Sequence, residues 1–400
     1  MKILMVISQF HPIIGGAERQ AQLLAQKLIE KGVQVEVVTG WWKWRTPRRE
    51  MINGVPVFRN FSFWGMFGIK GLRPLGALTY MITLAIHLFL HRAKYDIIHV
   101  HQILYPAFVS VFIGGGILKK PVLAKIGCTG ITSDVKNINR FPWGNLQLKY
   151  ILRHLDSLIA TNEEGMREFQ AIKYPEYKIV NIPNGVSIAL PKKTESKEML
   201  YAISAVRLDY QKGIDILLNS FKEVLEREKT IRLVILGRGP IEWELKKLAN
   251  SLGIAGSVEF LGLVDDPENY LKNSDIFILP SRAEGMSNAL LEAMCIGLSC
   301  IATNISGNRE LISDKENDSV PIGGYLIRDR GILVNPDDVG GLAEAILYLV
   351  RNEKTREELG RRARKFIQEN YSIDMIADKY ITLYQRILNK ESQCAESVEK

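Results

Sequence analysis

The chain has 400 residues, of which 46% are hydrophobic and 24% charged, with 52 Lys and Arg against 44 Asp and Glu and a formal net charge of +8. This composition is typical of globular proteins and excludes disordered and fibrous classes. The length is sufficient for two domains of ordinary size. Four cysteines without metal-ligand spacing indicate a reducing compartment, so we expect a cytoplasmic protein.

The first residues, MKILMVISQFHP, lack the small-residue cleavage site of a secretory signal and predict a buried strand. The most apolar window, Leu75–Leu90, is sixteen residues long and contains His87. It therefore falls short of the roughly 20 residues that span a bilayer. We expect this segment to be a helix that is buried or lies on a surface.

Short runs rich in Val, Ile and Leu alternate with amphipathic stretches of helical length. A first set of strands is expected at Ile3–Ile7, Val33–Thr39, Val55–Phe58, Ile97–His99, Val122–Ile126, Ser157–Ala160 and Ile179–Ile182. A second set is expected at Ala202–Val206, Leu233–Leu236, Val258–Phe260, Ile276–Leu279, Ser299–Ala302 and Ile332–Val334. Continuous apolar strands are typical of parallel sheets covered on both faces. The order predicts an α/β chain with two doubly wound, Rossmann-like domains.

A polar run, PKKTESKE, at Pro191–Glu198 is the best candidate for a linker between these domains. We predict an N-terminal domain over residues 1–190 and a C-terminal domain over residues 198–371. A final amphipathic helix, at about 372–390, is expected to pack back on the N-terminal domain. Paired α/β domains bind ligands at the carboxyl ends of their strands, so this organisation predicts two domains that face each other across a cleft.

The stretch GWWKWRTPRR, at residues 40–49, combines three tryptophans with four cationic side chains. Interleaved rings and cations suit the binding of a single-stranded nucleic acid. They also suit a membrane interface, where indole rings lie at the depth of the headgroups and cations meet anionic lipid. A third interpretation is that Trp41 and Trp42 simply pack beneath the loop.

The segment IFILPSRAEGMSNALLEAM, at residues 276–294, predicts a strand, a polar turn and a helix that opens near Glu284 and Gly285. Free amides at the start of a helix attract phosphate. Glu284 and Glu292 are eight residues apart, about 80° beyond two full helical turns. We expect them at opposite ends of a short helical stretch, where one carboxylate could meet a sugar and the other a ribose. The alternative for each is a helix cap or a solvated face.

Two further turns carry ligand-binding residue types. In AVRLDYQKG, at residues 205–213, Arg207 and Lys212 lie on a strand-to-helix turn, where two cations can neutralise a diphosphate. Plain surface charge is the alternative. In FHPIIGGAERQ, Gly15 and Gly16 allow a ligand to approach the backbone just before a helix. This turn lacks the G-x-G-x-x-G pattern, which disfavours a dinucleotide oxidoreductase.

The run YDIIHVHQ ends a strand with His99 and His101 on the same side of the backbone. Two histidines at this spacing could bind a metal ion, but no third ligand is identifiable in the sequence. A hydrogen-bonding role for His101 is the preferred interpretation.

Taken in chain order, these motifs resemble those of glycosyltransferase family 4. The resemblance covers nearly the whole chain and rests on GGAER at 15–19, YDIIHVHQ at 95–102, NIPNGV at 181–186, RLDYQKG at 207–213, FLG at 260–262, EGMSNALLEAM at 284–294 and GILVNPDDVGGLAEAI at 331–346. It implies a retaining, nucleotide-sugar-dependent enzyme with the GT-B fold. A run of extra residues, at about 314–329, departs from the family pattern.

The resemblance also implies roles for particular residues. His101 and Glu284 would be the catalytic residues, which contact the transferred sugar. The donor-binding residues would be Gly15, Gly16, Arg207, Lys212, Gly285, Met286 and Glu292. Arg207 and Lys212 would hold the diphosphate and Glu292 the ribose. No metal and no cofactor are expected, and the sequence contains no D-x-D motif.

The predicted function is transfer of a hexose from a UDP- or GDP-type sugar donor to a glycan or polyprenyl-linked acceptor, in cell-surface polysaccharide or glycolipid biosynthesis. The basic, aromatic loop at 40–49 would dock the protein on the inner face of the membrane and would not bind nucleic acid. One alternative is a nucleotide-sugar 2-epimerase of the same architecture. An alternative of another class is a basic nucleic-acid-binding protein.

Overall fold

The computed structural model describes residues 1–13, 15–63, 73–127, 134–139, 143–191, 198–315 and 319–398. The chain divides into two compact units. Unit 1 comprises Met1–Gly185 and Ile373–Lys400, and unit 2 comprises Val186–Ser372. The division falls at Gly185, a few residues before the polar run that the sequence suggests as a linker, and residues 192–197 of that run lie outside the described residues.

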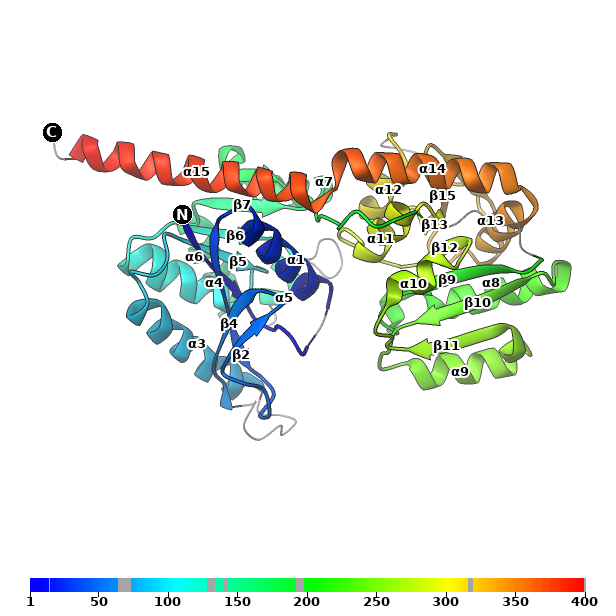
Figure 1. Ribbon diagram of the computed structural model, residues 1–400, viewed down its shortest axis with the longest axis horizontal. Helices are drawn as coiled ribbons and strands as arrows, with labels where there is room; N and C mark the ends of the chain where they lie inside the picture. The colour runs from blue at the N-terminus through cyan, green and yellow to red at the C-terminus, as the bar shows by residue number, and fades with distance from the viewer. Residues whose placement is uncertain are drawn as a thin grey trace. The chain divides into compact units, whose positions relative to one another are not determined.

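Unit 1 is built on an eight-stranded sheet of order β3-β4-β2-β1-β5-β6-β7-β8 (Figure 1). The strands are β1 (Lys2–Ile7), β2 (Gln34–Trp41), β3 (Arg49–Ile52), β4 (Val55–Phe61), β5 (Ile97–His101), β6 (Val122–Lys125), β7 (Ser157–Ala160) and β8 (Ile179–Asn181). The edge strand β3 is antiparallel to β4, whereas β1 pairs in parallel with both β2 and β5.

The helices of unit 1 are α1 (Gly16–Glu30), α3 (Arg73–Leu90), α4 (Tyr105–Val109), the π-helix η1 (Ser110–Ile117), α5 (Asp134–Ile138), α6 (Gly144–His154), α7 (Glu163–Ala171), η3 (Glu176–Lys178) and α15 (Ile373–Val398). The C-terminal helix α15 packs on α1, so the last segment of the chain contributes to the core of unit 1. Tyr380 and Tyr384 of α15 are fully buried in this core.

Unit 2 is built on a seven-stranded sheet of order β11-β10-β9-β12-β13-β15-β14. The strands are β9 (Leu200–Ala205), β10 (Ile231–Leu236), β11 (Val258–Gly262), β12 (Ile276–Leu279), β13 (Ser299–Thr303), β14 (Tyr325–Arg328) and β15 (Gly331–Val334). The helices are η4 (Tyr210–Lys212), α8 (Ile214–Arg227), α9 (Glu242–Ser251), η5 (Ala255–Ser257), α10 (Pro267–Lys272), α11 (Asn288–Ile296), α12 (Ser306–Ile312), α13 (Val339–Arg351) and α14 (Glu353–Asn370).

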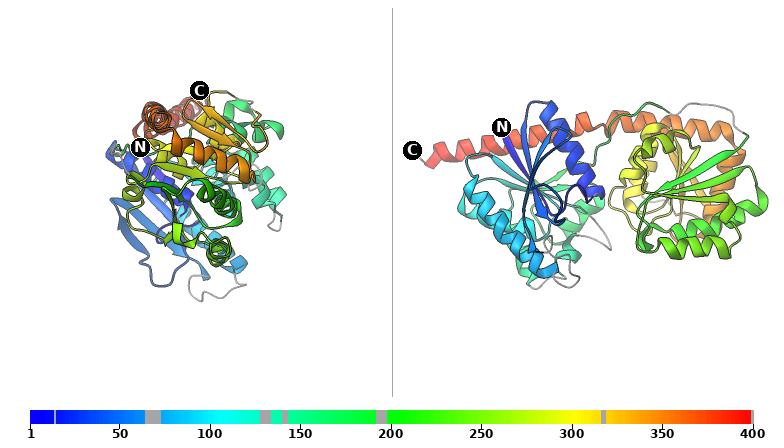
Figure 2. Two further views of the ribbon diagram at one scale, coloured as in Figure 1. Left: turned by 90° about the vertical axis from the view of Figure 1, so that its right-hand side faces the viewer. Right: turned by 60° about the horizontal axis from the view of Figure 1, so that its bottom comes forward.

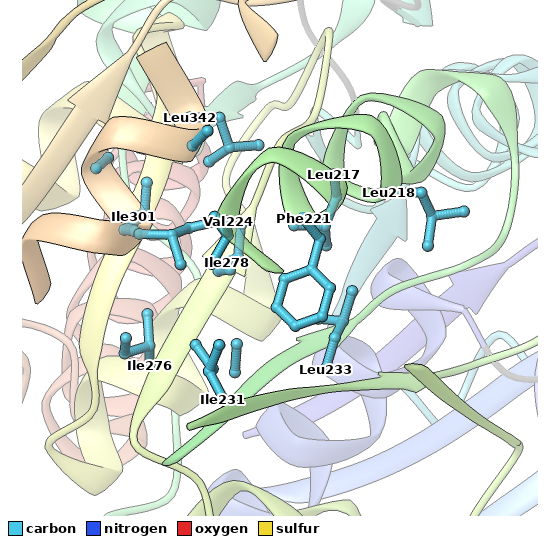
Figure 3. Close-up of a cluster of buried hydrophobic side chains, with 14 of the residues drawn as sticks. Leu217, Leu218, Phe221, Val224, Ile231, Leu233, Ile276, Ile278, Ile301 and Leu342 are labelled. Carbon is cyan, nitrogen blue, oxygen red and sulfur yellow. The ribbon is translucent and has the colours of Figure 1, made fainter. Parts of the chain in front are cut away.

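Helices lie on both faces of each sheet (Figure 2), which explains why the strands are continuously apolar. In β12, Ile276 and Ile278 enter one hydrophobic cluster, while Phe277 and Leu279 enter a second cluster on the opposite face. Figure 3 shows the first of these clusters, in which Phe221 of α8 lies over the strands. The predicted α/β class with two doubly wound sheets is confirmed.

Two strands were not expected from the sequence. Both β3 and β14 lie at the edges of their sheets and are antiparallel to their neighbours. β14 lies within the run of extra residues at about 314–329, so part of that insertion adds an edge strand to unit 2.

Candidate functional site

In unit 2, the turn after β9 brings Lys212 to the carboxyl edge of the sheet. The turn closes at Gly213, which has a φ of +66°. A Cβ atom at this position would lie 2.1 Å from the carbonyl oxygen of Pro280. Only glycine therefore lets the turn that precedes α8 approach the turn that follows β12 this closely.

These two turns place a cation against a carboxylate. Nζ of Lys212 lies 2.6 Å from Oε1 of Glu284, and the two side chains are 21% and 8% exposed. The hydroxyl of Ser281 also donates to Oε1 of Glu284 at 2.7 Å. The structure thus brings together two of the residues that the sequence suggested, and it adds Ser281, which the sequence analysis missed.

The helix after β12 begins later than the sequence suggested. α11 begins at Asn288, and the side chain of Ser287 caps it by accepting a hydrogen bond from the amide of Leu290. The prediction that the helix opens near Glu284 was therefore wrong. Glu284 lies in the preceding turn, and Glu292, which is half-buried, lies within α11. The helical angle expected between the two carboxylates consequently does not apply.

Gly285 and Met286 also lie in this turn, and the start of α12 holds it in place. A Cβ atom on Gly307 would lie 1.5 Å from the carbonyl oxygen of Gly285. The backbones of these two glycines are therefore in direct contact, which fixes the path of the chain beside Glu284.

Arg282 ties the same two turns together, and the sequence analysis did not identify it. Its guanidinium binds both carboxylate oxygens of Asp215 at 2.9 and 2.7 Å. It also binds Asp337 at 2.7 Å and lies 3.9 Å from the ring centroid of Tyr210. The hydrogen bonds to Asp215 raise the pKa of Arg282 above its usual value. Such bidentate pairs fix geometry as well as charge.

Arg207 is more exposed than Lys212. Its side chain is 72% exposed and pairs with Asp209, whose Oδ2 lies 2.6 Å from Nε of Arg207. A guanidinium has five N–H donors, so this pair leaves donors available for a ligand. Arg207 and Lys212 both lie on the segment between β9 and α8, as the sequence predicted.

In unit 1, Gly15 and Gly16 lie at the start of α1, which is the first helix after β1. Gly15 is the N-cap residue and is exposed, as is Gly16. A Cβ atom on Gly15 would lie 2.5 Å from Oε2 of Glu18, because the Glu18 carboxylate folds back over this turn. Burial raises the pKa of Glu18 above its ordinary value.

His99 and His101 lie on the same face of β5, and their rings stack with centroids 4.4 Å apart. Both are buried, with exposed fractions of 0% and 3%. Nδ1 of His99 forms a hydrogen bond of 2.7 Å with the hydroxyl of Tyr384, while Nε2 of His101 has no hydrogen-bond partner in the part of the chain that the structure describes. Among the residues that the structure describes, no three His, Cys, Asp or Glu side chains are grouped as they would be around a metal ion.

Two of the three tryptophans in the loop at 40–49 form hydrogen bonds, Trp42 to the first segment of unit 1 and Trp41 within the loop itself. The indole N–H of Trp42 donates to the carbonyl oxygen of Ser8 at 2.5 Å, and its ring lies against Tyr80. The indole N–H of Trp41 donates to the carbonyl oxygen of Thr46 at 2.8 Å. Trp44, by contrast, is 54% exposed.

Helix α3 has an exposed apolar face. We call this face the α3 stripe, and it consists of Leu75, Leu78, Ile82, Ile86 and Phe89, which are 39–53% exposed. Their spacing of three or four residues places them on one side of the helix, and Tyr80, Leu84 and Leu88 on the other side are buried. In the described part of the chain, no helix has the length and apolar character needed to cross a membrane.

Family models match both units. Residues 14–190 match the model described as Glycosyltransferase Family 4, and residues 188–366 match the model described as Glycosyl transferases group 1. This chain belongs to glycosyltransferase family 4. The resemblance noted in the sequence is thereby confirmed, and the two Rossmann-like units have the architecture of the GT-B fold.

Curated glycosyltransferases match along nearly their whole length. An uncharacterised glycosyltransferase of Methanocaldococcus jannaschii is 27% identical, over 96% of this chain and 98% of that protein. The N-acetyl-alpha-D-glucosaminyl L-malate synthase of Bacillus anthracis is 24% identical, over 95% of this chain and 96% of that protein.

Solved structures share the fold at lower sequence identity. Sucrose-phosphate synthase of Thermosynechococcus elongatus superposes with a TM-score of 0.77 at 17% identity, covering 98% of this chain and all of that chain. Anabaena HepE, solved in complex with UDP, superposes with a TM-score of 0.74 at 18% identity, covering 96% of this chain and all of that chain.

Proposed function

We propose that this glycosyltransferase is a retaining enzyme that transfers a hexose from a UDP- or GDP-sugar to a glycan or polyprenyl-linked acceptor at the inner face of a membrane. The observation that carries the proposal is the contact between Lys212 and Glu284 at the carboxyl edge of the unit 2 sheet. At this edge, a cation that can bind a diphosphate is hydrogen-bonded to a carboxylate that can bind a sugar. In a nucleotide sugar the diphosphate is bonded to the anomeric carbon of the hexose, so a cation and a carboxylate that are neighbours can each contact one of the two groups.

The diphosphate would bind to Arg207 and Lys212. An ammonium group has three N–H donors, so Lys212 can keep its bond to Glu284 while it binds a phosphate oxygen. Arg207 is exposed and keeps free donors beyond its pair with Asp209. Departure of the nucleoside diphosphate builds negative charge on these oxygens, and fixed cations stabilise that charge without reorganisation.

The hexose would lie beside Glu284 and the amides of Gly285 and Met286. Bonds from Lys212 and Ser281 hold Oε1 of Glu284. This fixes the carboxylate, so that it can accept hydrogen bonds from sugar hydroxyls and stabilise an oxocarbenium-like centre. The half-buried Glu292 of α11 would bind the ribose hydroxyls.

From unit 1, we assign contacts with the donor to the start of α1 and to one ring nitrogen of His101. The start of α1 at the exposed residues Gly15 and Gly16 is suited to phosphate, because it is the N-terminus of a fifteen-residue helix. His101 is buried, and we assign its sugar contact to Nε2, because this ring nitrogen has no hydrogen-bond partner among the described residues. No bound metal is invoked, because Arg207, Lys212 and helix-end amides can neutralise the diphosphate.

The donor class is supported by similar proteins. The Anabaena protein of the same fold binds UDP, and the Bacillus anthracis relative is named for an N-acetylglucosaminyl product. Both facts favour a nucleoside diphosphate that carries a hexose.

The acceptor side is supported by the α3 stripe and by the basic composition of the sequence segment that contains α3. From Met51 to Ser133 the sequence has eight Lys or Arg residues and a single acidic residue, Asp96, which accounts for most of the net charge of +8. An exposed apolar helix face in a cationic segment is suited to a bilayer of anionic lipid. We therefore assign membrane docking to the α3 stripe, with Trp44 and the exposed Arg45, Arg48 and Arg49 as additional contacts.

A donor panel tests the proposal. The full chain is incubated with UDP- and GDP-sugars, with and without lipid-linked acceptors, and release of nucleoside diphosphate is measured. Transfer or slow donor hydrolysis with at least one donor is expected. Interconversion of free sugar nucleotides without release would instead identify a 2-epimerase. Salt-sensitive oligonucleotide binding without any turnover would identify a nucleic-acid-binding protein.

A further inference from the structure

Two neighbouring strands of unit 1 end in basic side chains. β5 ends at His101 and β6 ends at Lys125, and the two residues are register partners in a parallel pair. Register partners in adjacent strands direct their side chains to the same face of the sheet. Both residues therefore lie on one face at the carboxyl edge, where doubly wound sheets bind their ligands.

Aromatic rings from α15 cover this face. Nζ of Lys125 lies 5.9 Å from the ring centroid of Tyr380, and the ring of His99 lies 5.2 Å from the same tyrosine ring. Lys125 is consequently only 6% exposed. An ammonium group is rarely buried to this extent unless a carboxylate accompanies it.

In the residue ranges that the structure describes, no carboxylate pairs with Lys125. Among the described residues its ammonium group has neither an ion pair nor a hydrogen bond. The titratable groups that face it from β5 and α15 are His99, His101, Tyr380 and Tyr384, and none of them is negatively charged at neutral pH. Burial alone lowers the pKa of Lys125 to about 7. An apolar side chain of similar length would fill the same space at lower cost, so packing does not explain a lysine here.

Within the described part of the chain, three polar atoms of the residues that pack near Lys125 also lack hydrogen-bond partners. They are Nε2 of His99, Nε2 of His101 and the hydroxyl oxygen of Tyr380, all of them buried. Buried polar atoms in folded proteins nearly always have a hydrogen-bond partner. A buried cation without a countercharge, near buried polar atoms, has the chemistry of an anion-binding site.

We propose that Lys125 forms a second phosphate-binding site, in unit 1, with Nε2 of His101 as an additional hydrogen-bond donor. The ligand is a diphosphate ester, which could be the nucleotide of the donor or the lipid diphosphate of the acceptor. The choice of ligand rests on the proposed glycosyl transfer, whereas the observations that indicate an anion site come only from contacts within unit 1. In a nucleotide sugar the phosphate is bonded to the reacting carbon of the sugar. The edge of the His101 ring that carries Nε2 can therefore face both the phosphate and the sugar.

Binding of an anion would recharge Lys125. At pH 8, one unit above its pKa of about 7, the free lysine is mostly neutral. A phosphate at Nζ favours the ammonium form, so the complex takes up about 0.9 proton from the buffer. UDP, GDP and farnesyl diphosphate are fully ionised at this pH, so they release no compensating proton.

Calorimetric titration of the full chain at pH 8, in two buffers of different ionisation enthalpy, tests the site. The probes are UDP, GDP and farnesyl diphosphate. Proton uptake with a nucleotide assigns the site to the donor, and uptake with farnesyl diphosphate assigns it to the acceptor. Absence of uptake with all three probes overturns the proposal.

Lys125→Met should abolish the uptake and weaken binding of the same probe at least tenfold, while the matched exposed variant Lys149→Met should change neither. Lys125→Met replaces a buried polar amine with an apolar side chain of similar length, so its thermal midpoint should not fall, which separates loss of the site from loss of the fold. Unchanged proton uptake in Lys125→Met would overturn the proposal. The titration does not require turnover, so failure of the proposed transferase activity would leave this test intact.

Discussion

Nζ of Lys212 lies 2.6 Å from Oε1 of Glu284, although the two residues are 72 positions apart in the chain. The glycine at 213 and the contact between Gly285 and Gly307 make this approach possible, because a side chain at either place would separate the turns. The pair is mostly buried, so its charges act in a medium of lower dielectric constant than water. Positioning of these two side chains is what the fold of unit 2 contributes to the proposed reaction.

Replacement of Gly307 by alanine should disrupt the turn that carries Glu284. The new Cβ atom would lie 1.5 Å from the carbonyl oxygen of Gly285, so the backbone must move. We expect a stability loss of about 1–3 kcal/mol and at least a tenfold loss of nucleotide affinity, measured by thermal unfolding and titration. Gly256→Ala is the matched control, because no atom lies within 4 Å of its Cβ position. Equal behaviour of the two variants would contradict this account.

Replacement of Arg282 by lysine should loosen the two turns while the charge is kept. Lysine cannot reproduce the bidentate contact with Asp215 together with the contact to Asp337. We expect unit 2 to lose about 1–3 kcal/mol of stability, seen as a lower thermal midpoint, together with weaker nucleotide binding. Arg361→Lys, which alters an exposed ion pair with Glu358, should change stability by less than about 0.5 kcal/mol. A thermal midpoint for Arg282→Lys within error of the wild-type value would show that the contacts of Arg282 with Asp215 and Asp337 do not stabilise unit 2.

Docking through the α3 stripe predicts lipid-dependent behaviour. The double variant Ile82→Ser, Ile86→Ser should bind vesicles of anionic lipid about tenfold or more weakly, since two half-exposed isoleucines no longer enter the bilayer. Sedimentation with phosphatidylglycerol vesicles measures this partition. Ile322→Ser is the control, because Ile322 is 98% exposed but lies in unit 2. The assignment of this surface would be contradicted if the wild-type chain bound neutral and anionic vesicles equally. It would also be contradicted if the double variant bound anionic vesicles as strongly as the wild type.

Buried neutral histidines should make unit 1 sensitive to acid. Burial lowers the pKa of both His87 and His99 to about 3. The unfolded chain, with histidine pKa values of about 6.5, binds these protons more readily, so stability falls as the pH drops from about 6.5 toward 3. The loss is about 1.4 kcal/mol per histidine for each pH unit.

Urea unfolding at pH 7.5 and 5.5 measures this loss through tryptophan fluorescence. Five of the six tryptophans precede residue 186, so the signal reports mainly on unit 1. Because the pKa of buried His101 is also lowered, three histidines share the pH effect, so His99→Gln should remove about a third of it, while the exposed His154→Gln should remove none. Identical stability of the wild-type chain at both pH values would contradict the assignment of buried, neutral histidines.

Much of the fold could be predicted from the sequence because the central strands are covered on both faces. The run IFIL at 276–279 alternates between two hydrophobic clusters, so every position is apolar. The edge strands β3 and β14 were missed for the opposite reason. Each has a neighbour on one side only and remains partly exposed, so its sequence carries a weaker pattern.

The sequence predicts which residues form the candidate site better than it predicts the contacts between them. Lys212 and Glu284 were identified from local motifs, but their pairing depends on two turns that meet in three dimensions. Arg282 was missed because its role appears only when Asp215 and Asp337 come together around it. The late start of α11 could have been anticipated, since Ser287 is a favoured N-cap residue directly before an apolar run.

The measurement that tests the central claim most directly is the turnover of a nucleotide sugar by matched variants. For the best donor, kcat/KM is compared between wild type, Glu284→Gln and Lys212→Met. The controls are Glu259→Gln and Lys222→Met, which alter exposed residues of the same unit. Charge-assisted hydrogen bonds contribute about 1.5–3 kcal/mol, so we expect each site variant to lose about 10- to 150-fold while the controls stay within about twofold. Turnover by Glu284→Gln and Lys212→Met at the wild-type rate, or no turnover of any donor by the wild-type chain, would contradict the account.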